Sequence, residues 1–171
     1  MQTAPEPRAA KPPVAWQWKR FGELGPAELY AILAARSAIF VVEQRCIFQD
    51  ADGYDASAWH LLGWTGTDSA RTLAAYLRLI EPGHKYREPL IGRVLTVAAL
   101  RGAGLGRDAM REGLRRCAEL YPGMPVRIAA QQRLERFYAS LGFCAASAPY
   151  EEDGILHVDM LRADSQAPAR E

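Results

Sequence analysis

The sequence predicts an α/β fold in which helices flank a central mixed, mostly antiparallel sheet. Strand-like and helix-like segments follow one another without the strict alternation of an all-parallel fold and without internal repeats. Two strand-like segments joined by the turn-like GTDSA predict an antiparallel hairpin near the middle of the chain. With 171 residues, of which 49% are apolar and 24% are charged, the chain can bury the core of one compact domain.

The first half of the chain contains this hairpin, one earlier strand and one long helix. Residues 15–21, AWQWKRF, alternate as a strand does. Pro26 is typical of a helix start, and apolar side chains at helical spacing carry this helix toward FVVEQ at 40–44. The Asp and Gly content of QDADGYD at 49–55 predicts a loop. The two strands of the hairpin are WHLLGWT at 59–65 and RTLAAYLRLI at 71–80.

The second half begins with a strand that is apolar on both faces, LIGRVLTV at 90–97, as a central strand should be. Gly92 within it predicts a bulge or a close approach of another backbone. A glycine-rich turn follows, and helical spacing then runs from Met110 to Tyr121. The remaining elements are a strand at 126–130, a helix at 131–143 stopped by Gly142, and a last strand at 155–162.

The composition of the two ends predicts one folded domain between flexible segments. Residues 1–14 are rich in Pro and Ala and predict a flexible leader, and residues 163–171 predict a flexible tail. Residues 15–162 form the predicted domain. The N-terminal segment lacks the apolar core of a signal peptide, and no run approaches the ~20 apolar residues that cross a bilayer.

Charge and cysteine content exclude several classes of function. The formal net charge of +1 provides no field that would attract nucleic acid or an anionic membrane. The three cysteines are widely spaced and form no CxxC pair, which disfavours a disulfide framework and a zinc site. We therefore expect a cytoplasmic protein with no metal, no nucleic-acid partner and no membrane partner.

The segment 94–107, VLTVAALRGAGLGR, places three glycines at alternate positions between a strand and a helix. Bare backbone next to the N-terminus of a helix suits an anion, most simply a phosphate. The nucleoside-triphosphate loop needs GxxxxGK[ST], whose lysine is missing here. The dinucleotide motif GxGxxG would need a third glycine at the position of Arg107.

Arg101, Gly104 and Gly106 match the pattern [RQ]-x-x-G-x-[GA]. FYASLGF at 137–143 matches a second signature in register with it, a helix that carries a tyrosine followed by a strand that opens with Gly-Phe. The segments FVVEQRCIFQDADGYD, HLLGW, IGRV and YEEDGILHVDM extend the match over Trp16 to Leu161. The chain thus resembles the GNAT acyltransferase superfamily and, within it, the ElaA-like branch. The resemblance implies the GNAT fold.

The resemblance also implies acetyl-CoA as co-substrate and direct transfer of its acetyl group to an amine, on a small molecule or on a protein, through a ternary complex. The pantetheine arm would lie along a strand as an added strand does, and backbone amides of the glycine turn would hold the pyrophosphate. Arg107 would add a positive charge at the rim. The implied CoA-binding residues are Val94, Leu95, Thr96, Val97, Arg101, Gly102, Ala103, Gly104, Leu105, Gly106 and Arg107.

Three residues are candidates for the proton transfers. Tyr138, by its place in FYASLGF, is the candidate general acid, since a phenol stays protonated at neutral pH. Glu43 is the first candidate for the base, because an apolar setting in AIFVVEQ would raise its pKa. His60 is the second candidate, against the alternative of a hydrogen-bonded histidine inside a strand.

Several alternatives stay open on sequence alone. Asp50, Asp52 and Asp55 suggest a solvated acidic loop, or else recognition of a cationic amine. Arg36 and Phe40, followed by Asp52 and Asp55, also have the spacing of acyl-homoserine-lactone synthases, which share the fold. A third alternative is a module that binds acyl-CoA without turnover. Dimers are common for this fold, which leaves a homodimer open.

Overall fold

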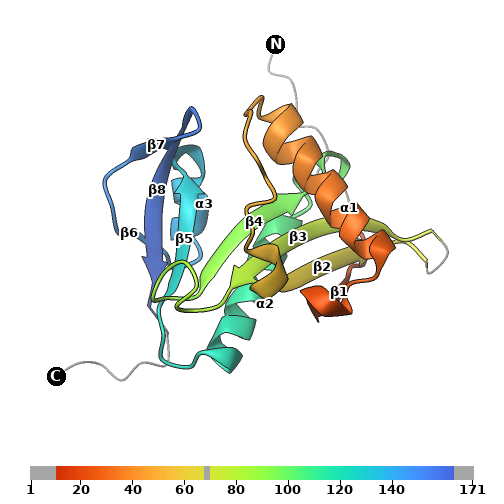
Figure 1. Cartoon of the computed structure of the whole chain (residues 1–171), viewed down its shortest axis with the longest axis horizontal. Coiled ribbons are helices and arrows are strands. Elements are labelled where there is room, and N and C mark those ends of the chain that lie inside the picture. The colour runs from red at the N-terminus through yellow and green to blue at the C-terminus, as the bar shows by residue number, and fades with distance from the viewer. Residues whose placement is uncertain (1–10, 68–69, 164–171) are drawn as a thin grey trace, which may run out of the picture.

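The computed structural model describes residues 11–67 and 70–163 (Figure 1). Its eight-stranded sheet has the order β1-β2-β3-β4-β5-β8-β6, and β7 pairs with β8. The β4–β5 pair is parallel and the other pairs are antiparallel, which is the predicted mixed sheet. The strands are β1 (Ala15–Arg20), β2 (Trp59–Thr65), β3 (Thr72–Ile80), β4 (Leu90–Thr96), β5 (Val126–Gln131), β6 (Cys144–Ala145), β7 (Tyr150–Glu152) and β8 (Ile155–Arg162). The α-helices are α1 (Pro26–Arg36), α2 (Leu105–Leu120) and α3 (Glu135–Ala139).

Apolar side chains fill both faces of the sheet. Leu61 of β2 packs in the cluster that contains residues of α2 and α3, whereas the next residue, Leu62, packs in a second cluster against α1. Alternate residues of a strand point to opposite faces, so α1 covers one face while α2 and α3 cover the other. Burial on both faces is the reason why the central strands read as continuous apolar runs.

The helix predicted from Pro26 toward Gln44 is present, but its second half is wider than an α-helix. After α1 the chain continues as a π-helix, η2 (Ser37–Glu43). The amide of Gln44 accordingly donates to the carbonyl of Ile39, five residues back, at 3.2 Å. Such wide turns are frequent at functional sites.

Strand β4 carries a bulge and then separates from β5. Tyr76 pairs with Leu95 and Arg78 with Gly92, so two residues of β4 lie opposite one residue of β3. The left-handed residue at this bulge is Arg93, with φ 52°, one position after the glycine that predicted an irregularity. On the other side β4 pairs with β5 only at Leu90, and Figure 1 shows the two strands diverging beyond that point.

The C-terminal part holds β7, which the sequence analysis did not predict, and β6, which directly follows Gly142 and Phe143, where the second signature implies a strand. The helix expected over 131–143 is shorter, because a 3-10 turn, η5 (Gln132–Leu134), precedes α3. Gly142, with φ 90°, follows α3 as predicted. Asp153 and Gly154 join β7 to β8 with φ of 51° and 78°, the backbone that Asp-Gly favours in tight hairpins.

The predicted leader and tail fall largely on residues 1–10 and 164–171, which lie outside the described residues. Of the predicted leader, Lys11 forms an ion pair with Asp108 of α2, and Val14 packs against the core. Within 11–67 and 70–163, no helix is long and apolar enough to cross a membrane.

Candidate functional site

A cleft of about 760 Å³ lies where β4 and β5 diverge. One wall is formed by β4 and the glycine turn after it, and the opposite wall by β5, η5, α3 and the β7–β8 hairpin. Residues of η2 and of the loop before β2, together with Arg78 of β3 and Lys85 of the β3–β4 loop, complete the lining. The sequence-predicted site residues that line the cleft are Glu43, Val94, Leu95, Thr96, Arg101, Gly102, Gly106 and Tyr138.

The glycine turn has the open backbone that a bound anion needs. Gly102 and Gly104 have φ of 81° and 87°, a conformation that L side chains rarely adopt, and a Cβ at either position would meet no protein atom within 4 Å. Gly104 is the N-cap of α2, so Leu105 and Gly106 present first-turn N–H groups and the positive end of the helix dipole. These features fit a phosphate group at the cleft.

Strand β4 has an unpaired edge in the cleft. Between Gly92 and Thr96 it pairs with β3 on one side, while on the other side no strand of the described chain pairs with it. Backbone groups at such an edge can bind an extended, amide-rich ligand as an added strand. The amide of Val97 is not among them, because it donates to the carbonyl of Ala74 at 3.0 Å.

Three predicted CoA-binding residues that do not line the cleft lie in or next to the glycine turn. The side chain of Leu105 is buried in the core, so only its backbone can reach a ligand. Ala103 packs against that core as well. Arg107 donates to Ser140 Oγ at 2.9 Å, and its guanidinium lies 5.4 Å from the ring centroid of Phe137, which links α2 to α3 near the turn.

Glu43 faces the cleft, but its environment differs from the apolar one that the sequence suggested. Arg101 donates from Nη2 to Glu43 Oε2 at 2.8 Å. This hydrogen bond lowers the pKa of Glu43, so the expectation of a raised pKa is wrong. A carboxylate stabilised by an arginine is a weaker base than one in apolar surroundings.

Tyr138 lies on α3 in the wall opposite β4. Its ring packs edge-on against Phe143, with centroids 6.1 Å apart. Burial raises the pKa of Tyr138 to about 12, so its hydroxyl keeps its proton at neutral pH.

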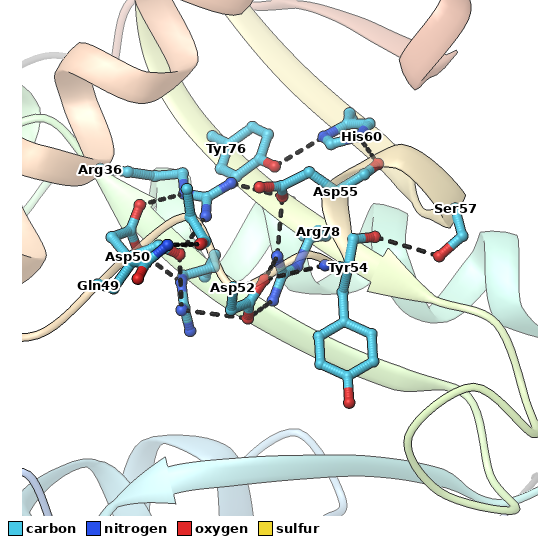
Figure 2. A network of polar contacts seen from close by, with 12 residues as sticks. Arg36, Gln49, Asp50, Asp52, Tyr54, Asp55, Ser57, His60, Tyr76 and Arg78 are labelled. Carbon is cyan, nitrogen blue, oxygen red and sulfur yellow. Dashed lines mark hydrogen bonds and ion pairs between the residues drawn. The ribbon is translucent and has the colours of Figure 1, made fainter.

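His60 does not line the cleft, and both of its ring nitrogens are occupied, as Figure 2 shows. A backbone carbonyl can only accept, so Nε2–H donates to the carbonyl of Asp55 at 3.0 Å. Nδ1 then accepts from the hydroxyl of Tyr76 at 2.8 Å. Burial lowers the pKa of His60. The structure therefore matches the alternative of a hydrogen-bonded histidine inside a strand.

Three arginines and three aspartates form a closed ring of ion pairs beside the cleft (Figure 2), which we call the Arg–Asp ring. Each arginine bridges two aspartates and each aspartate bridges two arginines, so the formal charges balance. The ion pairs are Arg36–Asp50 at 2.8 Å, Arg36–Asp55 at 2.6 Å, Arg78–Asp55 at 2.8 Å, Arg78–Asp52 at 2.6 Å, Arg93–Asp52 at 3.3 Å and Arg93–Asp50 at 2.7 Å.

The Arg–Asp ring corrects the interpretation of QDADGYD as a solvated acidic loop. Its aspartates are partly buried and neutralised, and the Arg36 side chain is only 1% exposed. A sequence signal for the ring existed, because Arg36, Arg78 and Arg93 each interrupt an apolar segment. A buried arginine needs a carboxylate partner, and the loop supplies three.

His157 of β8 also lines the cleft and lies outside the sequence-predicted site residues. Within the described part of the chain, no group of three or more His, Cys, Asp or Glu side chains is arranged to hold a metal ion.

This chain is similar in sequence and in fold to several known proteins. A family model described as an acetyltransferase (GNAT) domain matches residues 67–163. The protein ElaA of Escherichia coli is 40% identical over 156 residues, which cover 90% of this chain and 99% of ElaA. The crystal structure of ElaA superposes with a TM-score of 0.79 over 87% of this chain and 99% of that chain. An acyl-CoA N-acyltransferase structure from Pseudomonas aeruginosa has a TM-score of 0.82 at 39% identity, over 88% of this chain and 100% of that chain.

Proposed function

Because this chain belongs to the GNAT acetyltransferase family and is an acyltransferase, we propose that it transfers an acetyl group from acetyl-CoA directly to an amine acceptor in a ternary complex. The observation that carries the proposal is the cleft between β4 and β5. It brings an open glycine turn, an unpaired strand edge and a protonated tyrosine to one space.

The binding of acetyl-CoA would use backbone more than side chains. The pyrophosphate would meet the N–H groups of Leu105 and Gly106 at the start of α2, and the pantetheine arm would pair with the free edge of β4 at Val94–Thr96. Arg101 and Arg107 lie beside the turn as positive charges. In this arrangement the thioester would lie in the cleft within reach of Tyr138.

The transfer needs no covalent enzyme intermediate. The amine nitrogen attacks the thioester carbonyl, the C–N bond forms, and the C–S bond breaks. Tyr138 would donate the proton that the departing CoA thiolate takes up. Glu43 faces the cleft but is paired with Arg101, and His60 is enclosed, so neither is well placed as the base that accepts the amine proton.

The alternatives from the sequence receive less support. The Arg–Asp ring explains Arg36, Asp52 and Asp55, whose spacing suggested a homoserine-lactone synthase, as members of a structural network. A module that binds acyl-CoA without turnover would not need a protonated tyrosine in the cleft. Consumption of acetyl-CoA with an amine from a broad panel would exclude that module.

The substitution Gly104→Val tests the glycine turn. In the native protein, acetyl-CoA should raise the melting temperature by mass action, without an acceptor. Valine at φ 87° would strain the turn and place a branched side chain where the phosphates are expected. We expect Gly104→Val to lose the acetyl-CoA-dependent shift.

Gly83→Val is the matched control, because Gly83 has the same φ of 87°, its Cβ would also meet nothing within 4 Å, and it does not line the cleft. Both variants should lose similar stability from backbone strain, about 1–3 kcal/mol. Calorimetry of acetyl-CoA binding checks the difference. Native-like affinity in folded Gly104→Val would show that the phosphates bind elsewhere.

A further inference from the structure

His157 lies on the cleft side of β8, between two neighbours in the sheet. Tyr150 of β7 pairs with it and stacks on its ring, with centroids 6.1 Å apart and an interplanar angle of 26°. Gln131 of β5 pairs with it on the other side. His157 and Tyr138 line the same cleft, whereas Val158 and Met160 of the same strand point into the core. The imidazole is therefore held in place at the wall of the site.

The hydrogen bond of His157 determines which nitrogen carries the proton. Nδ1 lies 2.8 Å from the carbonyl of Ile155, which can only accept, so Nδ1–H is the donor. The neutral ring then carries its lone pair on Nε2, and among the described residues no hydrogen-bond partner of Nε2 is present. His60 has the opposite tautomer, with both nitrogens occupied.

We propose that His157 is the general base that accepts the acceptor's proton, an inference that rests on the proposed acetyl transfer. An alkylammonium group gives one proton to Nε2, and the neutral amine then forms the C–N bond as the C–S bond breaks. The CoA thiolate takes a proton from Tyr138, and the second proton lost by the nitrogen reprotonates the Tyr138 phenolate through solvent. His157 returns its proton to solvent, so the reaction releases one proton overall.

Several charged or titratable groups surround His157 and bear on its pH response. On its own strand, Asp159 binds Arg127 of β5 and accepts from the hydroxyl of Tyr150. The further groups that line the cleft are Glu43, Asp52, Tyr54, Arg78, Lys85, Arg93, Arg101, Arg133, Glu152 and Asp153. Cationic and acidic groups are both present, so His157 lies among charges of both signs.

The test compares His157→Gln with the native protein, using acetyl-CoA and the best substrate from a panel of primary alkyl amines. At pH 7 we expect kcat/KM to fall ~10²–10⁴-fold, with acetyl-CoA affinity within about twofold of native. The loss should shrink as the pH approaches the amine's own pKa, where the free amine needs no base. A merely structural role would lower the rate equally at every pH.

His84→Gln is the matched control, because His84 is exposed in the β3–β4 loop and does not line the cleft. It should keep the native rate and pH profile. If His157→Gln turns over like the native protein, or if its loss of kcat/KM is the same at every pH, His157 is not the base, while the proposed acetyl transfer still stands. If no amine reacts with the native protein although acetyl-CoA binds, the proposed transfer fails together with its base.

A spectroscopic readout needs no acceptor. The chain has three histidines, so ¹⁵N spectra of the native protein and of the His84→Gln and His157→Gln variants assign each imidazole. The neutral imidazole of His157 should be the Nδ1–H tautomer, whereas that of His60 should be the Nε2–H tautomer. An Nε2–H tautomer for His157 contradicts the proposal.

Discussion

At the scale of single residues, the role that we propose for Tyr138 depends on one proton. Burial holds its pKa at about 12, which keeps the hydroxyl protonated while leaving the group in contact with the cleft. We expect Tyr138→Phe to lower kcat by ~10²–10⁴-fold with little change in acetyl-CoA affinity, because phenylalanine keeps the ring packing and removes the donor. Steady-state kinetics and calorimetry measure the two effects separately.

Tyr121→Phe is the control for the loss of a tyrosine hydroxyl, at a residue that is half-buried. Burial raises the pKa of Tyr121 to about 12 as well, and its hydroxyl donates to Glu81 away from the cleft. This variant should keep kcat and lose about 1 kcal/mol of stability. If Tyr138→Phe turned over like the native protein where chemistry limits the rate, water would be the proton donor.

At the scale of elements, close packing between strands decides which glycines can be replaced. Gly63 of β2 lies opposite Trp16 of β1, and a Cβ at Gly63 would lie 2.6 Å from Trp16 Cζ3. Gly63→Val should therefore displace the indole and lower the free energy of unfolding by about 1–3 kcal/mol. Urea unfolding followed by tryptophan fluorescence measures this loss.

Gly92→Val provides the comparison within another strand, since a Cβ at Gly92 would meet nothing within 4 Å and its φ is not positive. Its stability should stay within about 0.5 kcal/mol of native. If Gly63→Val and Gly92→Val lost equal free energy of unfolding, the cause would be the replacement of a strand glycine as such, and not the contact with Trp16.

At the scale of the whole molecule, the Arg–Asp ring ties α1, the loop before β2, β3 and β4 together. Burial alone would raise the pKa of Asp55, but hydrogen bonds from Arg36 and Arg78 outweigh it and lower that pKa. A carboxylate with a lowered pKa in the folded state stabilises the protein above its unfolded pKa of about 3.9. This stability is lost as the pH falls through the folded value.

Asp55→Asn should lower the free energy of unfolding at pH 7 by about 3–5 kcal/mol, because two buried arginines lose a carboxylate. The difference from the native protein should begin to shrink below the unfolded pKa of about 3.9, and it should shrink further as the pH falls through the lower pKa of folded Asp55. Urea unfolding at a series of pH values checks both statements. Asp153→Asn is the control, because Asp153 is exposed and forms no ion pair among the described residues, so this substitution should change the free energy of unfolding little. If the difference between Asp55→Asn and the native protein stayed constant at acidic pH, the titration of Asp55 would not be its cause.

Much of the fold could be predicted because it depends on neighbours in the sequence. Alternation in 15–21 and the helix start at Pro26 are local patterns, and each produced the expected element. The strand β7 was missed because three residues carry no measurable period. The Asp153–Gly154 pair was a local signal for the β7–β8 turn.

The sequence by itself determined the GNAT family, the order of the main elements and the open glycine turn, since motif spacing and positive-φ glycines are local properties. Only the tertiary structure decided the states of the ionisable groups. Glu43 pairs with Arg101, and both ring nitrogens of His60 have hydrogen-bond partners. Nε2 of His157 has no hydrogen-bond partner among the residues that the structure describes. A pKa or a free lone pair depends on which distant residues fold against the group, and the sequence pattern does not contain those distances.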